Sequence, residues 1–196
     1  RLKNGTQTIN PCVTVTLTGR ISISMRNYVT INGGGRIVKS HIGSGMFSIH
    51  DRGSLTLENI TVDGNNVESE NAAIRVGMGT LNLNAGAVIQ NSYNVSDSLY
   101  DFNAGGGVLC DTDGVVNING GIIRNCRTSK ILESGYPHAH GGGGVYLRGG
   151  ICNMTAGSIT GNEATSGGAV YVGSGSTLNL SGGEISGNSA AGNGDG

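Results

Sequence analysis

The segment Gly79-Thr80-Leu81-Asn82-Leu83 recurs as Ser176-Thr177-Leu178-Asn179-Leu180, and each copy is followed by an apolar residue and, three positions later, by asparagine. Variants of this phrase fill most of the chain, and its last position recurs at steps of 26, 35, 36 and 26 residues: Asn65, Asn91, Cys126, Asn162 and Asn188. Self-similarity at a period of about 20 to 50 residues is typical of repeat proteins, in which each unit buries its apolar face against its neighbours. The repeat therefore decides the fold.

Each unit has the pattern of short β-strands. Leu81 and Leu83 point to one face of an extended segment, and Asn82 points to the other. Glycine pairs such as Gly120-Gly121 and Gly182-Gly183 interrupt the pattern, which suits a corner where the backbone needs a positive φ or a close approach. Because no long stretch has a helical period, a helix-based or leucine-rich repeat is excluded.

We therefore predict an all-β parallel β-helix of about seven coils, as a single domain over residues 1–196. Strands of successive coils would pair in register at about 4.8 Å, with Leu, Ile and Val stacked inside. Residues 1–12 are expected to form an N-terminal cap. No C-terminal cap is recognisable, so we expect the chain to be a fragment of a longer protein.

The recurring asparagine is expected to be structural, because a buried polar residue at one place in each coil satisfies backbone groups at a turn and bonds its neighbours. The third unit leaves two registers open. If Ile123 faces inward, Cys126 takes the asparagine place; if Ile122 does, Asn125 takes it.

Composition excludes several functional classes. Charged residues make up 13% of the chain, the net charge is −1, and the 12 Lys and Arg are scattered, whereas a nucleic-acid-binding surface needs them clustered. No apolar run reaches about 18 residues, so no membrane insertion is predicted. No signal-peptide pattern is present in this stretch either.

The cysteines have no CxxC or zinc-type spacing. Cys126 and Cys152 fall at repeat positions and are interpreted as small buried side chains. Cys110 is expected near Cys152 on an adjacent coil, where a disulfide is an alternative to two thiols. The redox state of the four residues, including Cys12, is left open.

Four segments carry a resemblance to a known class of protein: Gly-Gly-Gly-Val-Tyr-Leu (142–147), Ala-Gly-Ser-Ile-Thr-Gly-Asn (156–162), Gly-Gly-Ala-Val-Tyr-Val (167–172) and Gly-Gly-Glu-Ile-Ser-Gly-Asn (182–188). They resemble the right-handed parallel β-helix repeats of large bacterial adhesin-like surface proteins, within the pectin-lyase-like superfamily. The resemblance implies a right-handed helix and an extracellular protein, secreted or attached to the cell wall. That superfamily includes polysaccharide lyases, glycoside hydrolases and non-catalytic adhesins, so the fold does not decide among activities.

Two insertions, residues 92–106 and 127–143, follow the asparagine positions of consecutive coils and are expected to emerge from the same corner. Loops on a rigid scaffold are where function concentrates, and aromatic faces beside polar groups suit a sugar site. The residues predicted to bind a ligand are Tyr93, Tyr100, Asp101, Phe102, Tyr136, His138 and His140. The alternative is that the two loops pack on each other and only cover a side of the helix.

No catalytic residue is predicted. A glycoside hydrolase would need two carboxyl groups about 5 to 9.5 Å apart, and Asp97 or Asp101 with Glu133 would supply them. His138 and His140 with Asp101 make a weak metal hypothesis, because spacing fixes no third ligand. No metal or other cofactor is therefore predicted, and Ca²⁺ is permitted but not required by the turns.

A second candidate site is the turn His50-Asp51-Arg52, with Asp111 and Asp113 expected near it one or two coils on. Exposed turn-forming residues explain this group equally well.

The expected function is that of a non-catalytic cell-surface module, which binds a glycan or a host protein through the paired loops or acts as a rigid stalk. The alternative is a fragment of a carbohydrate-active enzyme, either a polysaccharide lyase or a glycoside hydrolase. We expect a monomer, with self-association through the open ends as the alternative and no nucleic-acid partner.

Overall fold

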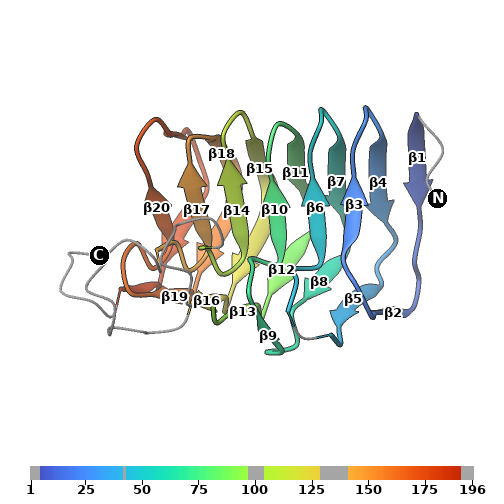
Figure 1. The fold of residues 1–196 in the computed structure, drawn as a ribbon, viewed down its shortest axis with the longest axis horizontal. Helices are drawn as coiled ribbons and strands as arrows, with labels where there is room; N and C mark the ends of the chain where they lie inside the picture. Colours follow the sequence, from blue (N-terminus) through green and yellow to red (C-terminus); the bar gives the residue numbers. More distant parts are fainter. Residues whose placement is uncertain (1–4, 42, 97–103, 129–140, 191–196) are drawn as a thin grey trace.

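The computed structural model describes residues 5–41, 43–96, 104–128 and 141–190 (Figure 1). Every helix or strand assigned within these ranges is a β-strand, and every pairing between the named strands is parallel. The prediction of an all-β chain of parallel strands is confirmed. No helix in the ranges given is long and apolar enough to cross a membrane.

The strands form three sheets. Sheet A contains β1 (Thr6–Ile9), β2 (Thr14–Leu17), β4 (Tyr28–Asn32), β5 (Arg36–Lys39), β7 (Ser54–Glu58), β8 (Thr61–Asp63), β11 (Thr80–Asn84), β12 (Val88–Gln90), β15 (Val115–Arg124), β18 (Ile151–Thr160), β21 (Thr177–Leu180) and β22 (Glu184–Ser186). Sheet B contains β3 (Ile21–Ile23), β6 (Phe47–Ile49), β10 (Ile74–Val76), β14 (Val108–Asp111), β17 (Val145–Arg148) and β20 (Val170–Val172). Sheet C contains β9 (Glu68–Ser69), β13 (Tyr93–Asn94), β16 (Arg127–Thr128), β19 (Glu163–Ala164) and β23 (Ser189–Ala190).

From β7 onward the chain visits the sheets in a fixed order, whereas the two earlier repeats pass directly from sheet A to sheet B. From β7 and β8 of sheet A it passes through β9 of sheet C and β10 of sheet B to β11, which pairs with β7 in register, Leu81 against Leu55. Strands that are neighbours in space are therefore one sequence repeat apart. Figure 1 shows the strands of sheet B side by side along the long axis, with their colours in sequence order.

The leucine pairs of the repeat build the core. Leu55, Leu57, Leu81 and Leu83 are fully buried, whereas Asn82 between the last two is partly exposed. Period-2 alternation places every second side chain inside, as the sequence predicts.

The open register of the third unit is resolved in favour of Ile123. This residue is fully buried and pairs with Ile89, and Cys126 is also fully buried. Ile122 is only partly buried and pairs with Val88.

The expected asparagine column is only partly correct. Asn162 is buried, accepts from the Cys126 N–H through Oδ1 at 2.9 Å, and donates through Nδ2 to the Ile123 carbonyl at 3.1 Å. Asn65 and Asn91, however, have φ of 55° and 53°, so they lie in left-handed turns rather than in the core. The reason is that asparagine tolerates the left-handed region, so the same residue type recurs at a neighbouring turn for a backbone reason.

Two segments are more regular than expected. Residues 6–9, inside the expected cap, form β1, which pairs with β4 with Thr8 against Thr30. The first residues of both insertions form β13 and β16, which pair with each other. Two-residue strands are too short for a period to be recognised in a sequence.

The four cysteines are free thiols, so the disulfide between Cys110 and Cys152 is not formed in this structure. Burial raises the pKa of Cys110, Cys126 and Cys152 to about 12, which keeps them protonated. Cys12 is exposed.

Candidate binding groove at the turns between sheets B and A

Short turns lead from the strands of sheet B to the next strands of sheet A, and they differ in length. Ile49 pairs with Val76 and Ser54 pairs with Thr80, so residues 50–53 of one turn stand opposite residues 77–79 of the next, one residue fewer. The turns on either side, 24–27 and 111–114, have the length of turn 50–53. A short turn therefore lies between longer ones.

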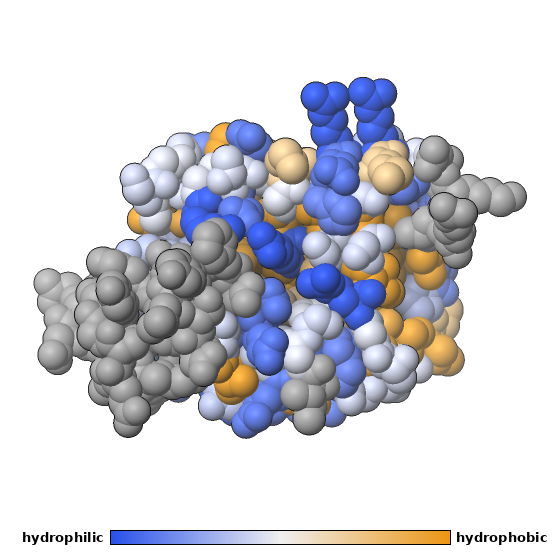
Figure 2. All heavy atoms as spheres, viewed as in Figure 1, coloured by the Kyte–Doolittle hydropathy of each residue, from blue (hydrophilic) through white to orange (hydrophobic). Residues whose placement is uncertain are grey.

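The shortened turn coincides with two adjoining hollows. The larger, of about 720 Å³, is lined by Met25, Arg26, Asp51, Arg52, Met78 and Asp113. The smaller, of about 350 Å³, shares Met78 and Asp113 and extends to His50, Arg75 and Asp111. We call the two together the corner groove. Figure 2 shows long hydrophilic side chains rising from the turns that follow β3 and β6, beside this groove.

Backbone hydrogen bonds join the turns into a ladder. The N–H of Arg26 donates to the Asp51 carbonyl at 3.4 Å, that of Arg52 to Met78 at 2.6 Å, and that of Met78 to Thr112 at 3.2 Å. Asp51, Arg52 and Met78 have φ of 50°, 63° and 53°. Left-handed backbone at non-glycine residues costs about 1 to 2 kcal/mol per residue and clusters at functional sites.

Gly79 is needed beneath the groove. A Cβ at this position would lie 2.8 Å from Cγ2 of Ile49 and 2.9 Å from the carbonyl oxygen of Gly53. Glycine at this position therefore permits the close approach of the short turn to Ile49 and Gly53.

The groove is lined by both apolar and charged side chains. Met78 is 54% exposed and Met25 is 70% exposed, so two thioether side chains are open to solvent. The guanidinium groups of Arg26 and Arg52 supply donors, and the carboxylates of Asp51 and Asp113 supply acceptors. A concave surface with an apolar area and a few polar groups on its rim is typical of a ligand-binding site.

Asp111 closes one side of the smaller hollow in a fixed ion-pair cluster. Its carboxylate accepts from Arg75 Nη2 at 2.8 Å and from Arg148 Nε and Nη2 at 3.0 and 2.5 Å. Burial alone would raise the pKa of Asp111, but the hydrogen bonds from Arg148 and Arg75 outweigh it, and the pKa lies below its ordinary value. Asp111 is therefore an ionised structural group.

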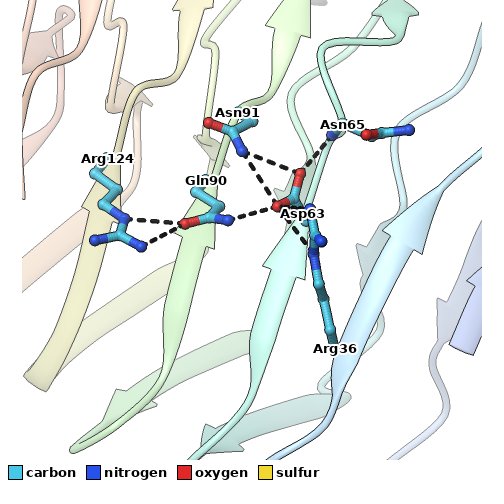
Figure 3. A network of polar contacts seen from close by, with 6 residues as sticks. All are labelled: Arg36, Asp63, Asn65, Gln90, Asn91 and Arg124. Atoms are coloured by element: carbon cyan, nitrogen blue, oxygen red, sulfur yellow. Dashed lines mark hydrogen bonds and ion pairs between the residues drawn. The ribbon is translucent and has the colours of Figure 1, made fainter. Parts of the chain in front are cut away.

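A buried carboxylate, Asp63, lies at the centre of a polar network on sheet A (Figure 3). It accepts from Arg36 Nε at 3.1 Å, from Gln90 Nε2 at 2.5 Å, and from the backbone N–H of Asn65 at 2.6 Å. Arg124 extends the network by donating to Gln90 Oε1. Burial raises the pKa of Asp63, but these hydrogen bonds lower it further than burial raises it.

The lowered pKa values of Asp63 and Asp111 do not suit general acid catalysis, which needs a raised pKa. Among the residues that the structure describes, no group of three or more His, Cys, Asp or Glu side chains is arranged to hold a metal ion.

Of the ligand-binding residues predicted from the sequence, Tyr93 lies in the described part of the chain. The guanidinium of Arg127 covers one face of its ring at 4.1 Å from the ring centroid, so that face is not open to a sugar. Outside the described residues lie Tyr100, Asp101, Phe102, Tyr136, His138 and His140, together with Asp97 and Glu133 of the enzyme alternative.

The second candidate site of the sequence analysis does come together, because His50, Asp51 and Arg52 share the corner groove with Asp111 and Asp113. Sequence reasoning missed Met25, Arg26 and Met78. The signal that would have found them is the missing residue at 77–79, which is visible when Ile49 to Ser54 is aligned with Val76 to Thr80.

No protein-family model, curated protein or solved structure matches the chain. What the groove binds is therefore inferred from its own side chains.

Proposed function

We propose that the chain is a non-catalytic glycan-binding module built on a right-handed parallel β-helix, of the extracellular surface type that its repeats resemble. The helical architecture is supported by the order in which the chain visits sheets A, C and B from β7 onward. It is also supported by the pairing of each strand with the strand one repeat away.

The corner groove carries the proposal. A sugar ring laid across the shortened turn places its C–H face on Met78, within reach of the guanidinium and carboxylate groups of Arg52 and Asp113 for its hydroxyls. Met25 and Arg26 extend the same surface toward the next turn, so the groove has room for more than one ring.

The strands that follow the groove turns carry a regular ladder of side-chain hydrogen bonds. Amide Nδ2 groups donate along a ladder on the outer face of sheet A, from Asn179 to Asn153 at 2.8 Å, from Asn153 to Asn117 at 2.9 Å and from Asn117 to Asn82 at 2.9 Å. A preorganised surface loses little conformational entropy on binding. Rigidity of this kind suits a surface module that presents a site.

A glycan-array screen tests the proposal, with Arg52→Ala and Asp113→Asn as groove variants. Arg20→Ala is the matched control, since Arg20 is exposed and directly precedes β3, whereas the groove turn follows β3. We expect each groove variant to lose about tenfold in affinity, equivalent to about 1.4 kcal/mol, and the control to bind like the wild type.

Two results would refute the assignment. Absence of binding to any glycan removes the proposed ligand class, and groove variants that bind as well as the wild type remove the groove. Release of reducing ends from a bound glycan would support the enzyme alternative, which depends on Asp97, Asp101 and Glu133.

A further inference from the structure

Two arginines of the corner groove lie side by side on neighbouring turns. The strand β3 pairs with β6 and β4 with β7, and the turns that join them, 24–27 and 50–53, have the same length. Arg26 therefore stands opposite Arg52, at the spacing of adjacent strands, about 4.8 Å. The backbone hydrogen bond from the Arg26 N–H to the Asp51 carbonyl ties the two turns together. Figure 2 shows long hydrophilic side chains rising from the turns that follow β3 and β6.

These two guanidinium groups differ from most others in the described part of the chain. The side chains of Arg26 and Arg52 form no ion pair or hydrogen bond with any residue that the structure describes, and both are exposed. Five other arginines each bind a carboxylate, an amide oxygen or an aromatic ring: Arg36, Arg75, Arg124, Arg127 and Arg148. Two adjacent positive charges in the groove are therefore left without a direct partner.

The arrangement is unfavourable for the chain by itself. Like charges that stand opposite one another on paired segments repel. Arg26 and Arg52 also have φ of 59° and 63°, a left-handed conformation that glycine or asparagine adopts more readily. Residues held in such conformations cluster at ligand-binding and catalytic sites. An anion bound between the two guanidinium groups would remove their repulsion.

The carboxylates of the groove do not take this place. The Asp51 carboxylate is bonded to Nδ1 of His50 at 2.9 Å, and Asp111 is held by two arginines of its own. Asp113 lies beyond the short turn that carries Met78, on the side away from Arg52. The groove therefore has paired cationic groups on one side of Met78 and a carboxylate acceptor on the other.

We propose that the corner groove selects glycans that carry an anionic group, a carboxylate or a sulfate, bound between Arg26 and Arg52. This inference rests on the proposed function and names the class of glycan. A guanidinium presents two parallel N–H donors, which match the oxygens of either anion. The sugar ring lies on Met78, and a hydroxyl beyond it donates to Asp113, so the glycan takes one direction along the groove.

Isothermal titration calorimetry with matched acidic and neutral oligosaccharides tests the proposal. The carboxylate arm uses hyaluronan oligosaccharides and their carboxyl-reduced form, and the sulfate arm uses keratan sulfate oligosaccharides and their desulfated form. In at least one arm the acidic form should bind about tenfold more tightly than its neutral form, because a hydrogen bond to a charged group is stronger than one to a neutral group. The difference should shrink as salt rises from about 0.05 M to about 0.5 M.

Substitutions then locate the anion. Arg26→Gln and Arg52→Gln remove the charge and keep a polar side chain, so each should weaken the acidic form about tenfold and the neutral form by no more than about twofold. Arg20→Gln is the matched control, because Arg20 is exposed and lies outside the groove. Asp113→Asn should weaken both forms alike, since it faces a hydroxyl that both carry. Circular dichroism checks the fold of each variant.

Three results would overturn the inference. Neutral forms that bind as tightly as the acidic forms would remove the anion selectivity and leave the proposed function standing. An acidic preference that persists in both glutamine variants would place the anion away from the two arginines. Binding of none of the four oligosaccharides would also overturn the inference, and the wider glycan array then decides separately whether the proposed function falls.

Discussion

Replacing Asp63 with asparagine should be among the most destabilising single changes in the described part of the molecule. The side chain is fully buried, and its two oxygens receive donors from Arg36, Gln90, Asn91 and the Asn65 backbone. Asparagine has nearly the same shape, but one of its two polar atoms is a donor. In either orientation its amide group faces other donors at close range.

The loss in the free energy of unfolding follows from the donors that Asp63→Asn leaves without a carboxylate partner. Removing one partner of a buried ion pair costs about 3 to 5 kcal/mol, because the remaining groups stay desolvated. The Arg36 side chain is 46% exposed and regains water, which places the effect at the lower end, about 3 kcal/mol. For a chain of this size that is a fall in Tm of about 6 to 12 °C.

The pH dependence gives an independent signature. Because the pKa of Asp63 is lower in the folded than in the unfolded chain, its contribution is fully present above the unfolded value of about 4. It is lost as pH falls through the folded pKa. The wild type should therefore lose stability below about pH 4, and Asp63→Asn should lose less over the same range.

Urea unfolding followed by circular dichroism at several pH values measures both effects. Glu70→Gln serves as the control, since Glu70 is exposed and its loss should change stability by no more than about 0.5 kcal/mol. An Asp63→Asn protein as stable as this control at neutral pH would refute the reading of the network as a buried, fully bonded charge.

Three further predictions concern the core, the turns and the thiols. Gly79→Ala should destabilise the chain by about 1 to 3 kcal/mol in thermal unfolding, since the added Cβ would lie 2.8 Å from Ile49 Cγ2. Unchanged stability would mean that the short turn can relax. Asn162→Ala should cost about 2 to 3 kcal/mol in urea unfolding, because the buried Cys126 N–H loses its acceptor, and a neutral result would show that the bond is dispensable. Titration with an aromatic disulfide at pH 8 should label Cys12 quickly in the native protein and all four thiols only after unfolding. The reason is that burial raises the pKa of the other three thiols to about 12. Rapid labelling of Cys126 in the native protein would contradict that burial.

Much of the fold could be predicted because the same pattern of apolar and polar residues recurs in successive repeat units. Each Leu-x-Leu pair predicts which face of its strand is buried. Five copies of the phrase agree, so the open register of one unit, between Ile122 and Ile123, does not change the prediction for the rest of the chain. The all-β class, the parallel pairing and the inward residues Leu55 and Leu81 follow from this pattern, whereas the choice of Ile123 over Ile122 comes from the structure.

The corner groove could not be predicted with the same ease. It lies at turn 77–79, which is one residue shorter than the turns on either side, and the repeat phrase, which consists of core and corner residues, does not predict turn length. The Asp63 network was missed for a similar reason. Arg36, Asp63 and Gln90 lie on three different strands, and only the register of those strands brings them together.

The most direct test of the central claim, that the corner groove binds a glycan, uses the four methionine methyl groups as reporters. Met25 and Met78 are exposed in the groove, and Met46 and Met154 are 0% and 1% exposed in the core. Protein labelled with ¹³C at the methionine methyls is titrated with soluble neutral and acidic oligosaccharides and followed by NMR. We predict that a binding oligosaccharide moves the Met25 and Met78 signals and leaves Met46 and Met154 in place. Binding with no change at Met25 and Met78, or no binding by any oligosaccharide, would contradict the claim.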